Sequence, residues 1–486
     1  MIRPTRQHAL TRRGEGFSFR RQMSLHKRFG MVVLSSWSAA RLVVCMVLIS
    51  ALSPAQAQSL PDLYQQALSA DPAYTGVSAQ RRVADERVIQ ARAGFLPTVV
   101  YTASESRSHY VSEQEHRPFA SRQSQLQLTQ PLLRASALST WNQQKEVVEA
   151  TEAQVQGANL DVMQRLVTAY FDVLSARDNL QLVRGQKEAT SAQLAVAKRS
   201  FTVGTVSVTD VREAEAKLDT IAAQESAAEY DLVLKQELLE QLVGQKVDSD
   251  RALTPDSALP ALLASENQLW LDEAEDANPQ VVQARHALEA ARLEIDTARG
   301  AHLPTLDFTA GVTKTTNTGT TLTSAQQDGR TRQIGVNLNV PLFSGLSTQS
   351  KVREALAQHD KARSDLEGAR KAATQLVREA FYATLSALSQ VHGLGAAERS
   401  ADTAVRANRR GYEVGLRINA DVLNAQSQLY QTRRDLSKAR YDAWVNYVKL
   451  LGASGKLSVD DLQTLDQALK MPVPLSQQSA KPEGQS

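Results

Sequence analysis

The sequence predicts an α+β membrane protein that combines a few β-strands with very long helices. Three observations lead to this fold class. The chain contains two similar halves, which indicates an internal duplication. Each half has the same order of elements: a short helix, a Leu-Pro step, two strands of alternating polarity and a long helical hairpin with a glycine at its tip. An export leader precedes the first half, so the folded part is expected outside the cytoplasm.

The internal duplication is visible in three matched segments, whose spacing drifts only from 207 to 211 residues. It divides the chain into a first structural repeat at 58–265 and a second at 266–456. A tail follows at 457–486, and we expect it to be partly disordered. The matched segments are QARAGFLPT (90–98) with TARGAHLPT (297–305), QPLL (130–133) with VPLF (340–343), and FTVGTVSVTDV (201–211) with YEVGLRINADV (412–422).

Residues 1–57 are predicted to be a signal peptide. A basic region comes first, an apolar stretch follows at Leu42–Leu52, and Ala55-Gln56-Ala57 forms the small-residue exit that is typical of cleavage sites. The apolar stretch is shorter than the ~20 residues that a membrane-spanning helix needs, so a membrane anchor is the weaker interpretation. Because the leader is long, translation starts at either Met1 or Met23.

The charge balance changes when the leader is removed. The whole chain has a formal net charge of +3, but nine of its 55 basic residues and one of its 52 acidic residues lie in the leader, which leaves a net charge of −5. An acidic chain gives no reason to expect nucleic acid as a partner. The only cysteine, Cys45, also lies in the leader. Since no nucleophile–base pair, metal-ligand spacing or phosphate loop appears, we expect no enzyme activity, no catalytic residues, no metal and no cofactor.

Four segments alternate in polarity as β-strands do, at about 97–110, 121–132, 304–314 and 331–342. The third is the clearest, because every second residue from Leu306 to Val312 is apolar. One apolar and one polar face over roughly ten residues is typical of a transmembrane barrel strand. The alternative interpretation is a half-buried sheet in a soluble domain.

Four strands are too few to close a barrel, which needs about eight even when its interior is filled. An open sheet edge in lipid leaves backbone groups unpaired, at a cost of several kcal/mol each. We therefore expect several copies of the chain to pool their strands in one barrel. The polar linkers at 109–120 and 315–330 are expected to be exposed loops.

Two very long helical hairpins are predicted at about 135–244 and 346–452. No proline interrupts 135–203, and a helix of about 69 residues reaches on the order of 100 Å. After each tip, positions spaced by 3.5 residues are apolar at eight of ten sites, from 211 to 242 and again from 422 to 453. This spacing predicts a coiled-coil seam, and its many alanines predict close helix packing.

These features resemble the TolC family of outer-membrane channel-tunnel proteins over about 59–455. The likeness is closer to members with export and efflux roles than to lipid-anchored efflux members. It implies a homotrimer with a 12-stranded outer-membrane β-barrel, four strands from each chain, that continues into an α-helical periplasmic tunnel. The stretches that carry the resemblance are AHLPTLDFTAG (301–311), LQLTQPL (126–132), TAYFDVL (168–174), FTVGTVSVTDV (201–211) and GYEVGLRINADVLNA (411–425).

The hairpin tips contain the candidate site residues. Gly204 and Gly415 supply the left-handed residue that ends a helix. Asp210 and Asp421 occupy equivalent places in the first turn of the next helix, where the helix dipole stabilises a carboxylate by ~0.3–1 kcal/mol. On the residues alone, this structural role is the simpler interpretation. The resemblance implies in addition that a periplasmic adaptor docks at the tips, which comprise Val203, Gly204, Thr205, Val414, Gly415 and Leu416.

The resemblance also implies a gate, because TolC-like proteins hold their periplasmic mouth shut by contacts between neighbouring tips. The positions that match this latch are Thr209, Asp210, Tyr412 and Arg417. A guanidinium and a phenol can both donate to the Asp210 carboxylate. The family also places two acidic rings in the constriction. Asp421 matches the first ring, whereas the second position is Asn424 and departs from the pattern, so strong block by multivalent cations is in doubt.

The predicted function is a passive outer-membrane duct that works with a periplasmic adaptor and an inner-membrane ABC or proton-driven transporter. Type I secretion of a protein such as an RTX-type toxin (a haemolysin or cyclolysin) is favoured, and the outer-membrane component of a tripartite multidrug efflux pump is the alternative. A structural trimeric adhesin is the alternative from another class, although its strands would lie together at the C-terminus. The sequence leaves open the cargo, the cognate adaptor and transporter, and the gating trigger.

Overall fold

The computed structural model describes residues 59–113, 115–247, 259–320, 322–323 and 325–469. The predicted signal peptide at 1–57 lies outside these residues, and so does the end of the expected tail at 470–486. Residues 57–486 form one compact unit and are described by themselves. Among the helices described, none has the length and apolar character to cross a membrane.

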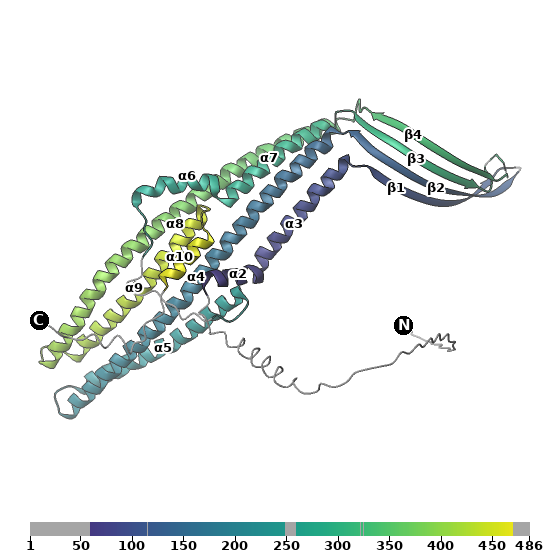
Figure 1. Ribbon diagram of the computed structural model, residues 1–486. Coiled ribbons are helices and arrows are strands. Elements are labelled where there is room, and N and C mark those ends of the chain that lie inside the picture. The colour runs from purple at the N-terminus through teal and green to yellow at the C-terminus, as the bar shows by residue number, and fades with distance from the viewer. Residues whose placement is uncertain (1–58, 114, 248–258, 321, 324, 470–486) are drawn as a thin grey trace, which may run out of the picture. The chain divides into compact units, whose positions relative to one another are not determined.

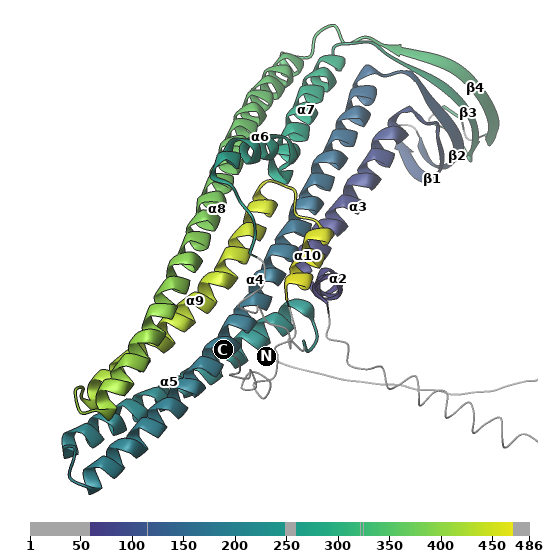
Figure 2. The same ribbon diagram turned by 60° about the vertical axis from the view of Figure 1, so that its left-hand side comes forward.

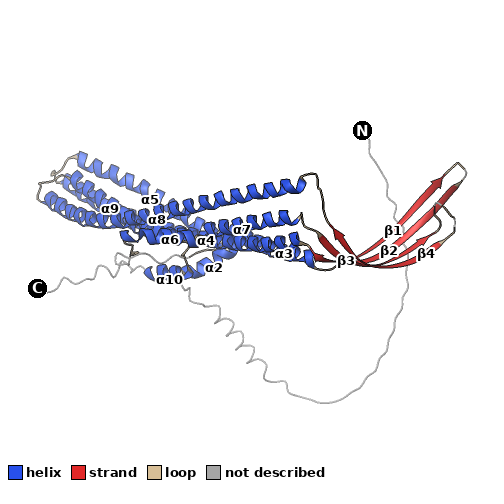
Figure 3. Cartoon of the chain, turned by 90° about the horizontal axis from the view of Figure 1, so that it is seen from above, coloured by secondary structure: helices blue, strands red, loops and turns tan. Residues whose placement is uncertain are grey.

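A four-stranded antiparallel sheet is formed in the order β1-β2-β3-β4 (Figure 3). Its strands are β1 (Thr98–Val111), β2 (His116–Leu133), β3 (Thr305–Asn317) and β4 (Gln327–Asn339). The central pair joins the two repeats, since β2 belongs to the first and β3 to the second. In the described chain, β1 and β4 are the outer strands, and each pairs on one side only.

The hairpin turns are shorter than the sequence indicated. β2 begins at His116 and pairs with β1 through Pro118, so the first turn spans only 112–115. The outer part of β2, HRPFAS at 116–121, contains a proline and does not alternate in polarity, so the pattern that marks a strand is lost there. At the other end, β4 stops at Asn339, before Pro341, because proline has no N–H to donate to the ladder.

The strand register sorts the side chains onto two faces, because directly opposite residues share a face. One face, which we call the band face, is apolar over the half of the sheet nearest the helices and charged over the other half. The opposite face, the polar face, is rich in Gln, Thr, Ser and Asn. The apolar residues in the half of the band face nearest the helices are Val99, Tyr101, Ala103, Leu126, Leu128, Leu133, Leu306, Phe308, Ala310, Val312, Ile334, Val336 and Leu338.

The polar face carries charge only near its two ends in the described residues. Asp307 lies near the helices and binds Arg134 at 3.1 Å. Arg117 lies near the outer turn and pairs with Glu115. Between them the face is uncharged, and neighbouring amides are hydrogen-bonded along β2, as Gln125 Nε2 donates to Gln127 Oε1 at 2.8 Å.

The helices extend from the sheet to the hairpin tips at the opposite end of the unit (Figures 1 and 2). The two repeats match closely in length, since α4 has 68 residues and its counterpart α8 has 67. Short 3₁₀ segments at Ala93–Phe95 and Ala264–Glu266 precede β1 and α6. The helices are α2 (Leu60–Ala70), α3 (Pro72–Arg92), α4 (Ala135–Thr202), α5 (Val208–Val243), α6 (Asn267–Ala277), α7 (Pro279–Gly300), α8 (Ser347–Glu413), α9 (Asn419–Ala453) and α10 (Val459–Ala468).

The predicted coiled-coil seams are confirmed, because every seam position of α5 and α9 is buried or half-buried. The two charged seam residues of α5 are satisfied by partners on α4. Glu225 accepts from Lys187 at 2.6 Å, and Lys235 donates to Asp172 at 2.9 Å. Charge at these two positions therefore joins the helices of the first hairpin instead of interrupting the seam.

The main core lies where the short helices cover the middle of the long ones. Tyr170 and Phe171 of α4 pack there with Tyr441 and Trp444 of α9, and with leucines of α2 and α10. The expected tail at 457–486 thus begins with an ordered helix, since Leu462 and Leu465 of α10 are buried in this core.

Candidate functional site

The two hairpin tips have the same backbone geometry. Each first helix ends in a glycine with positive φ, +76° at Gly204 and +77° at Gly415. Each turn is then closed by a backbone hydrogen bond: Thr205 N–H donates to the Ser200 carbonyl at 3.0 Å, and Leu416 N–H donates to the Gly411 carbonyl at 2.8 Å. Glycine is required here because a Cβ is disfavoured in the left-handed region.

The equivalent aspartates at the tips have different partners. At the first tip, Ser207 is the N-cap of α5, and its backbone N–H donates to Asp210 Oδ2 at 3.0 Å. The second tip has Ile418 at the N-cap, which offers no side-chain hydrogen bond. Asp421 instead faces Arg417 of the turn that precedes α9, with 3.6 Å between Nη1 and Oδ2.

A cavity of about 920 Å³ separates the two tips and contains three of the four predicted latch residues in its wall. Asp210 reaches it from the first tip, and Tyr412 and Arg417 reach it from the second. The structure does not join Arg417 to Asp210 within one chain. Thr209 is exposed outside this wall, where its Oγ1 lies 3.2 Å from Ser207 Oγ.

The hydroxyl of Tyr412 is buried and has no hydrogen-bond partner within the described chain. An unsatisfied buried hydroxyl costs free energy until it finds a partner. Asp210 lines the same cavity and carries a carboxylate, which can accept a hydrogen bond.

Arg417 is positioned by the glycine six residues before it. A Cβ at Gly411 would lie 2.7 Å from Arg417 Cγ, so the aliphatic stem of the arginine rests on the glycine backbone. Arg417 N–H also donates to the Gly411 carbonyl at 3.1 Å. The guanidinium itself stays exposed, which leaves it available to a partner.

A buried polar link joins the two tips, and the sequence analysis missed it. Gln193 Nε2 of α4 donates to Asn419 Oδ1 at 2.6 Å, and Asn419 Nδ2 donates to the Asp210 carbonyl at 3.3 Å. Leu194 and Leu423 pack beside this link. The partners are more than 200 residues apart, so the only sequence signal was a polar residue, Asn419, where the first repeat has Val208.

The predicted docking and ring residues lie on accessible surface. Val203 and Leu416 are 73% and 82% exposed, so apolar side chains project at both tips. Asn424 is exposed and Asp421 is half-buried. Because they are three residues apart on α9, these two side chains are neighbours on one helix face.

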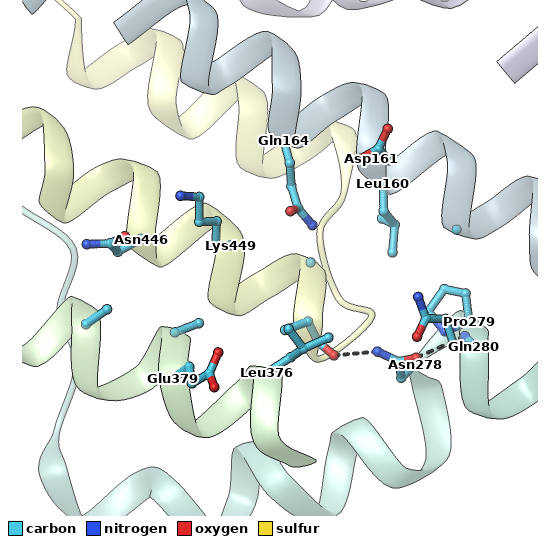
Figure 4. A pocket seen from close by; sticks show the side chains of 15 residues that line it. Leu160, Asp161, Gln164, Asn278, Pro279, Gln280, Leu376, Glu379, Asn446 and Lys449 are labelled. Atoms are coloured by element: carbon cyan, nitrogen blue, oxygen red, sulfur yellow. Dashed lines mark hydrogen bonds between the residues drawn. The ribbon is translucent and has the colours of Figure 1, made fainter. Parts of the chain in front are cut away.

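A second cavity, of about 450 Å³, lies where the repeats join in the middle of the unit (Figure 4). Within the second repeat, Asn278 Nδ2 donates to the Ala453 carbonyl at 2.8 Å. Gln164 of the first repeat lies over Gly452 of the second, so a Cβ at Gly452 would displace the end of the glutamine side chain. Among the described residues, no group of His, Cys, Asp and Glu is arranged to hold a metal. Residues of both repeats line this cavity, and the tips remain the candidate site.

Comparison with known proteins identifies the family. A family model described as "Outer membrane efflux protein" matches residues 63–245 and 270–456, one segment in each repeat. Outer membrane protein TolC of Salmonella enteritidis is 32% identical over 433 residues, which cover 88% of each chain. Alkaline protease secretion protein AprF of Pseudomonas aeruginosa is 30% identical, with 84% of this chain and 86% of that protein covered.

A solved structure supports the same fold. The outer membrane protein VceC of Vibrio cholerae superposes with a TM-score of 0.68 at 19% sequence identity, over 82% of this chain and 96% of that chain. The internal duplication, the four antiparallel strands and the long helices predicted from the sequence are thereby confirmed. This chain belongs to the outer membrane efflux protein family, and it is a TolC-type channel of the outer membrane with a helical periplasmic part, not an enzyme.

Proposed function

We propose that three copies of this chain form one channel, which serves type I secretion of a protein such as an RTX-type toxin (a haemolysin or cyclolysin). The observation that carries the proposal is the open sheet, in which β1 and β4 each lack a partner on one side in the described chain. In lipid, unpaired strand edges cost several kcal/mol for each backbone group. Neighbouring copies remove that cost by pairing β4 of one chain with β1 of the next. The number three follows from the family resemblance.

The tips form the gate of this channel in our proposal. Thr209, Asp210, Tyr412 and Arg417 make the latch between neighbouring tips. The tip cavity supports this role, because the unpartnered Tyr412 hydroxyl and the Asp210 carboxylate border the same space. The exposed Arg417–Asp421 pair contributes little to stability, so Arg417 can exchange Asp421 for Asp210 at low cost.

The constriction below the latch is formed by Asp421 and Asn424. With asparagine at the second position, three copies carry a single ring of carboxylates on this part of α9. A ring with half the family's charge attracts multivalent cations less strongly. We therefore expect weak block by such ions.

The exposed apolar tips support docking of a periplasmic adaptor. Val203, Val414 and Leu416 project from the two turns together with Gly204, Thr205 and Gly415. Large exposed apolar side chains that lie close together mark interaction sites. An adaptor that binds here would connect the channel to an inner-membrane ABC or proton-driven transporter, which supplies the energy.

Protein secretion is favoured as the task because the similar protein AprF is an alkaline protease secretion protein. The family description as an efflux protein favours the second candidate, the outer-membrane component of a tripartite multidrug efflux pump. Family membership leaves the adhesin alternative without support.

A deletion strain separates the two candidates. Removing the gene should abolish export of the cognate protein substrate, measured in the culture medium, while susceptibility to a panel of drugs changes little. Complementation with the intact gene is the control. Unchanged secretion together with strongly raised drug susceptibility would assign the channel to efflux.

Single-channel conductance tests the latch. The double variant Asp210→Ala/Arg417→Ala should conduct more than the wild-type trimer in planar bilayers. Lys361→Ala/Asp365→Ala is the matched control, because it removes an exposed acid–base pair of α8, joined at 2.6 Å, outside the tip cavity. Equal conductance of wild type and the latch variant would reject the latch assignment.

A further inference from the structure

Three cations cluster on the outer half of the band face. Lys314 of β3 and Arg330 of β4 are direct cross-strand partners, and Arg332 is the next residue of β4 on the same face. All three side chains are exposed. We call these residues the basic cluster.

The basic cluster carries an excess of positive charge, because Asp328 is the one carboxylate that β3 and β4 place on this face beside three cations. None of its members forms an ion pair with a carboxylate within the described residues, although like charges directly opposite each other destabilise a sheet. The carboxylate of β1 on this face, Glu105, is already bound by Arg107 at 3.4 Å and Arg122 at 3.1 Å. Such a site is stabilised by an anion that bridges the cations.

The position of the basic cluster along the strands indicates which leaflet of the membrane it faces. Lys314 lies eight residues beyond Leu306, which is about 26 Å along a strand. Because barrel strands are tilted, this length corresponds to a height of about 20 Å, which is near the outer end of the ~25 Å apolar band of an outer-membrane barrel. Because the helices extend into the periplasm from the Leu306 end, the basic cluster lies at the headgroups of the outer leaflet.

A shallow hollow of about 640 Å³ lies beside the cluster on the same face. Tyr101, Leu126 and Val312 provide its apolar part, and Lys314, Arg330 and Asp328 provide its charged rim. Asp328 is one cross-strand pair nearer the outer turn, where it accepts from Gln326 at 3.3 Å. An apolar surface beneath a cationic rim suits an amphiphile with an anionic head.

We infer that the basic cluster and this hollow form a binding site for a phosphorylated glycolipid of the outer leaflet. The Arg330 guanidinium offers two parallel donors to a phosphate, and the Lys314 ammonium adds a point charge opposite it. An acyl chain lies over Leu126 and Val312. Arg332 lies two residues from Arg330 along β4, closer to the apolar half of the face. Its long side chain extends its charged end outward to the same headgroup. The inference depends on the outer-membrane location alone, and not on the cargo or the gate.

Lipid binding to the purified trimer tests the site. The probe is a lipid A with two phosphates, titrated into detergent-solubilised protein and followed by native mass spectrometry. Lys314→Gln/Arg330→Gln should weaken binding by about 30-fold, since each cation near an anionic lipid surface is worth about fivefold. Lys314→Arg/Arg330→Lys keeps both charges and should retain binding. Arg117→Gln is the control for Arg330→Gln, because it removes one charge near the outer turn of the opposite face.

Two results would overturn the inference. One is equal affinity of the wild type and the charge-neutral double variant for the phosphorylated lipid, with both proteins verified as intact trimers. The other is equal affinity of the wild type for the same lipid after both phosphates are removed. If the double variant fails to assemble, lipid binding is compared between the single variants Arg330→Gln and Arg117→Gln. Equal weakening of lipid binding by both would also refute the site.

Discussion

The two hairpin tips have one backbone and two sets of side chains. The glycines have φ values within 1° of each other, and both turns close on the carbonyl of an equivalent residue. The side chains differ where the tips face the cavity: Phe201 and Val206 of the first tip correspond to Tyr412 and Arg417 of the second. The comparison teaches that the backbone of the turn is set by glycine, whereas the chemistry of the tip is set by residues that the turn does not constrain.

The aspartates make the same point at one position. Asp210 caps α5 because serine stands three residues before it, and Asp421 has an arginine partner because isoleucine stands at the N-cap. The capping bond engages only Oδ2 of Asp210, so Oδ1 remains for the proposed latch. Asp421 accepts no such capping bond, because Ile418 is the N-cap of its helix.

The largest effect is expected from the shared backbone. Gly204→Ala and Gly415→Ala should each destabilise their own tip by about 1–2 kcal/mol, because both put a Cβ in the left-handed region. The measurement is amide exchange of the tip peptides, which should become about tenfold faster or more. Gly368→Ala, in open space on α8, should leave exchange at both tips unchanged. Clearly different changes of amide exchange in the two variants would show that the two turns are not equivalent.

A smaller effect should separate the tips. Ser207→Ala removes the cap of α5 and should cost about 1 kcal/mol, whereas Ile418→Ala removes no cap from α9. Amide exchange at 208–211 should therefore accelerate in the first variant, while exchange at 419–422 stays constant in the second. Ile418→Ser extends the test, because a new cap should draw Asp421 away from Arg417 and slow exchange there. Equal acceleration in both alanine variants would contradict the difference in capping.

The smallest effect is expected when the pH is lowered. Hydrogen bonds from Lys198 and Lys187 hold the pKa of Glu215 and Glu225 below the usual range for glutamate. A carboxyl with a lowered folded pKa contributes stability above its unfolded pKa and loses it as pH falls through the folded pKa. Between about pH 5 and about pH 3, amide protection of α5 should fall relative to that of α9. Glu215→Gln/Glu225→Gln should remove this pH dependence. If the ratio of α5 protection to α9 protection in the wild type stays constant over this pH range, the prediction is refuted.

Much of the fold could be predicted because it follows from local periodicity. The 3.5-residue spacing from Val211 onward identified the seam, and the Leu-Pro steps located the strand starts. The extension of β2 through Pro118 was missed, because Pro118, Phe119 and Ala120 interrupt the alternation of polar and apolar residues. Helix α10 was also missed, although Ser458 and Asp461 form a capping box that the sequence displays.

The tip chemistry was only partly predictable. Tyr412, Arg417 and Asp210 could be selected by resemblance, and they do border one cavity. The Arg417–Asp421 contact was readable from a spacing of four residues, as was the Ser207–Asp210 cap from a spacing of three. The Gln193–Asn419 bond depends on how two hairpins meet in space, and no local pattern reports that.

The polar face of the sheet has a consequence for whatever passes through the barrel. Between Asp307 and Arg117, each charged group being held by its own counter-ion, the wall offers amides and hydroxyls. Under the proposed secretion function, a translocating polypeptide meets a lining that neither attracts nor repels it by charge, whether it is rich in lysine or in glutamate. Any discrimination between passengers must be completed before they reach the outer membrane.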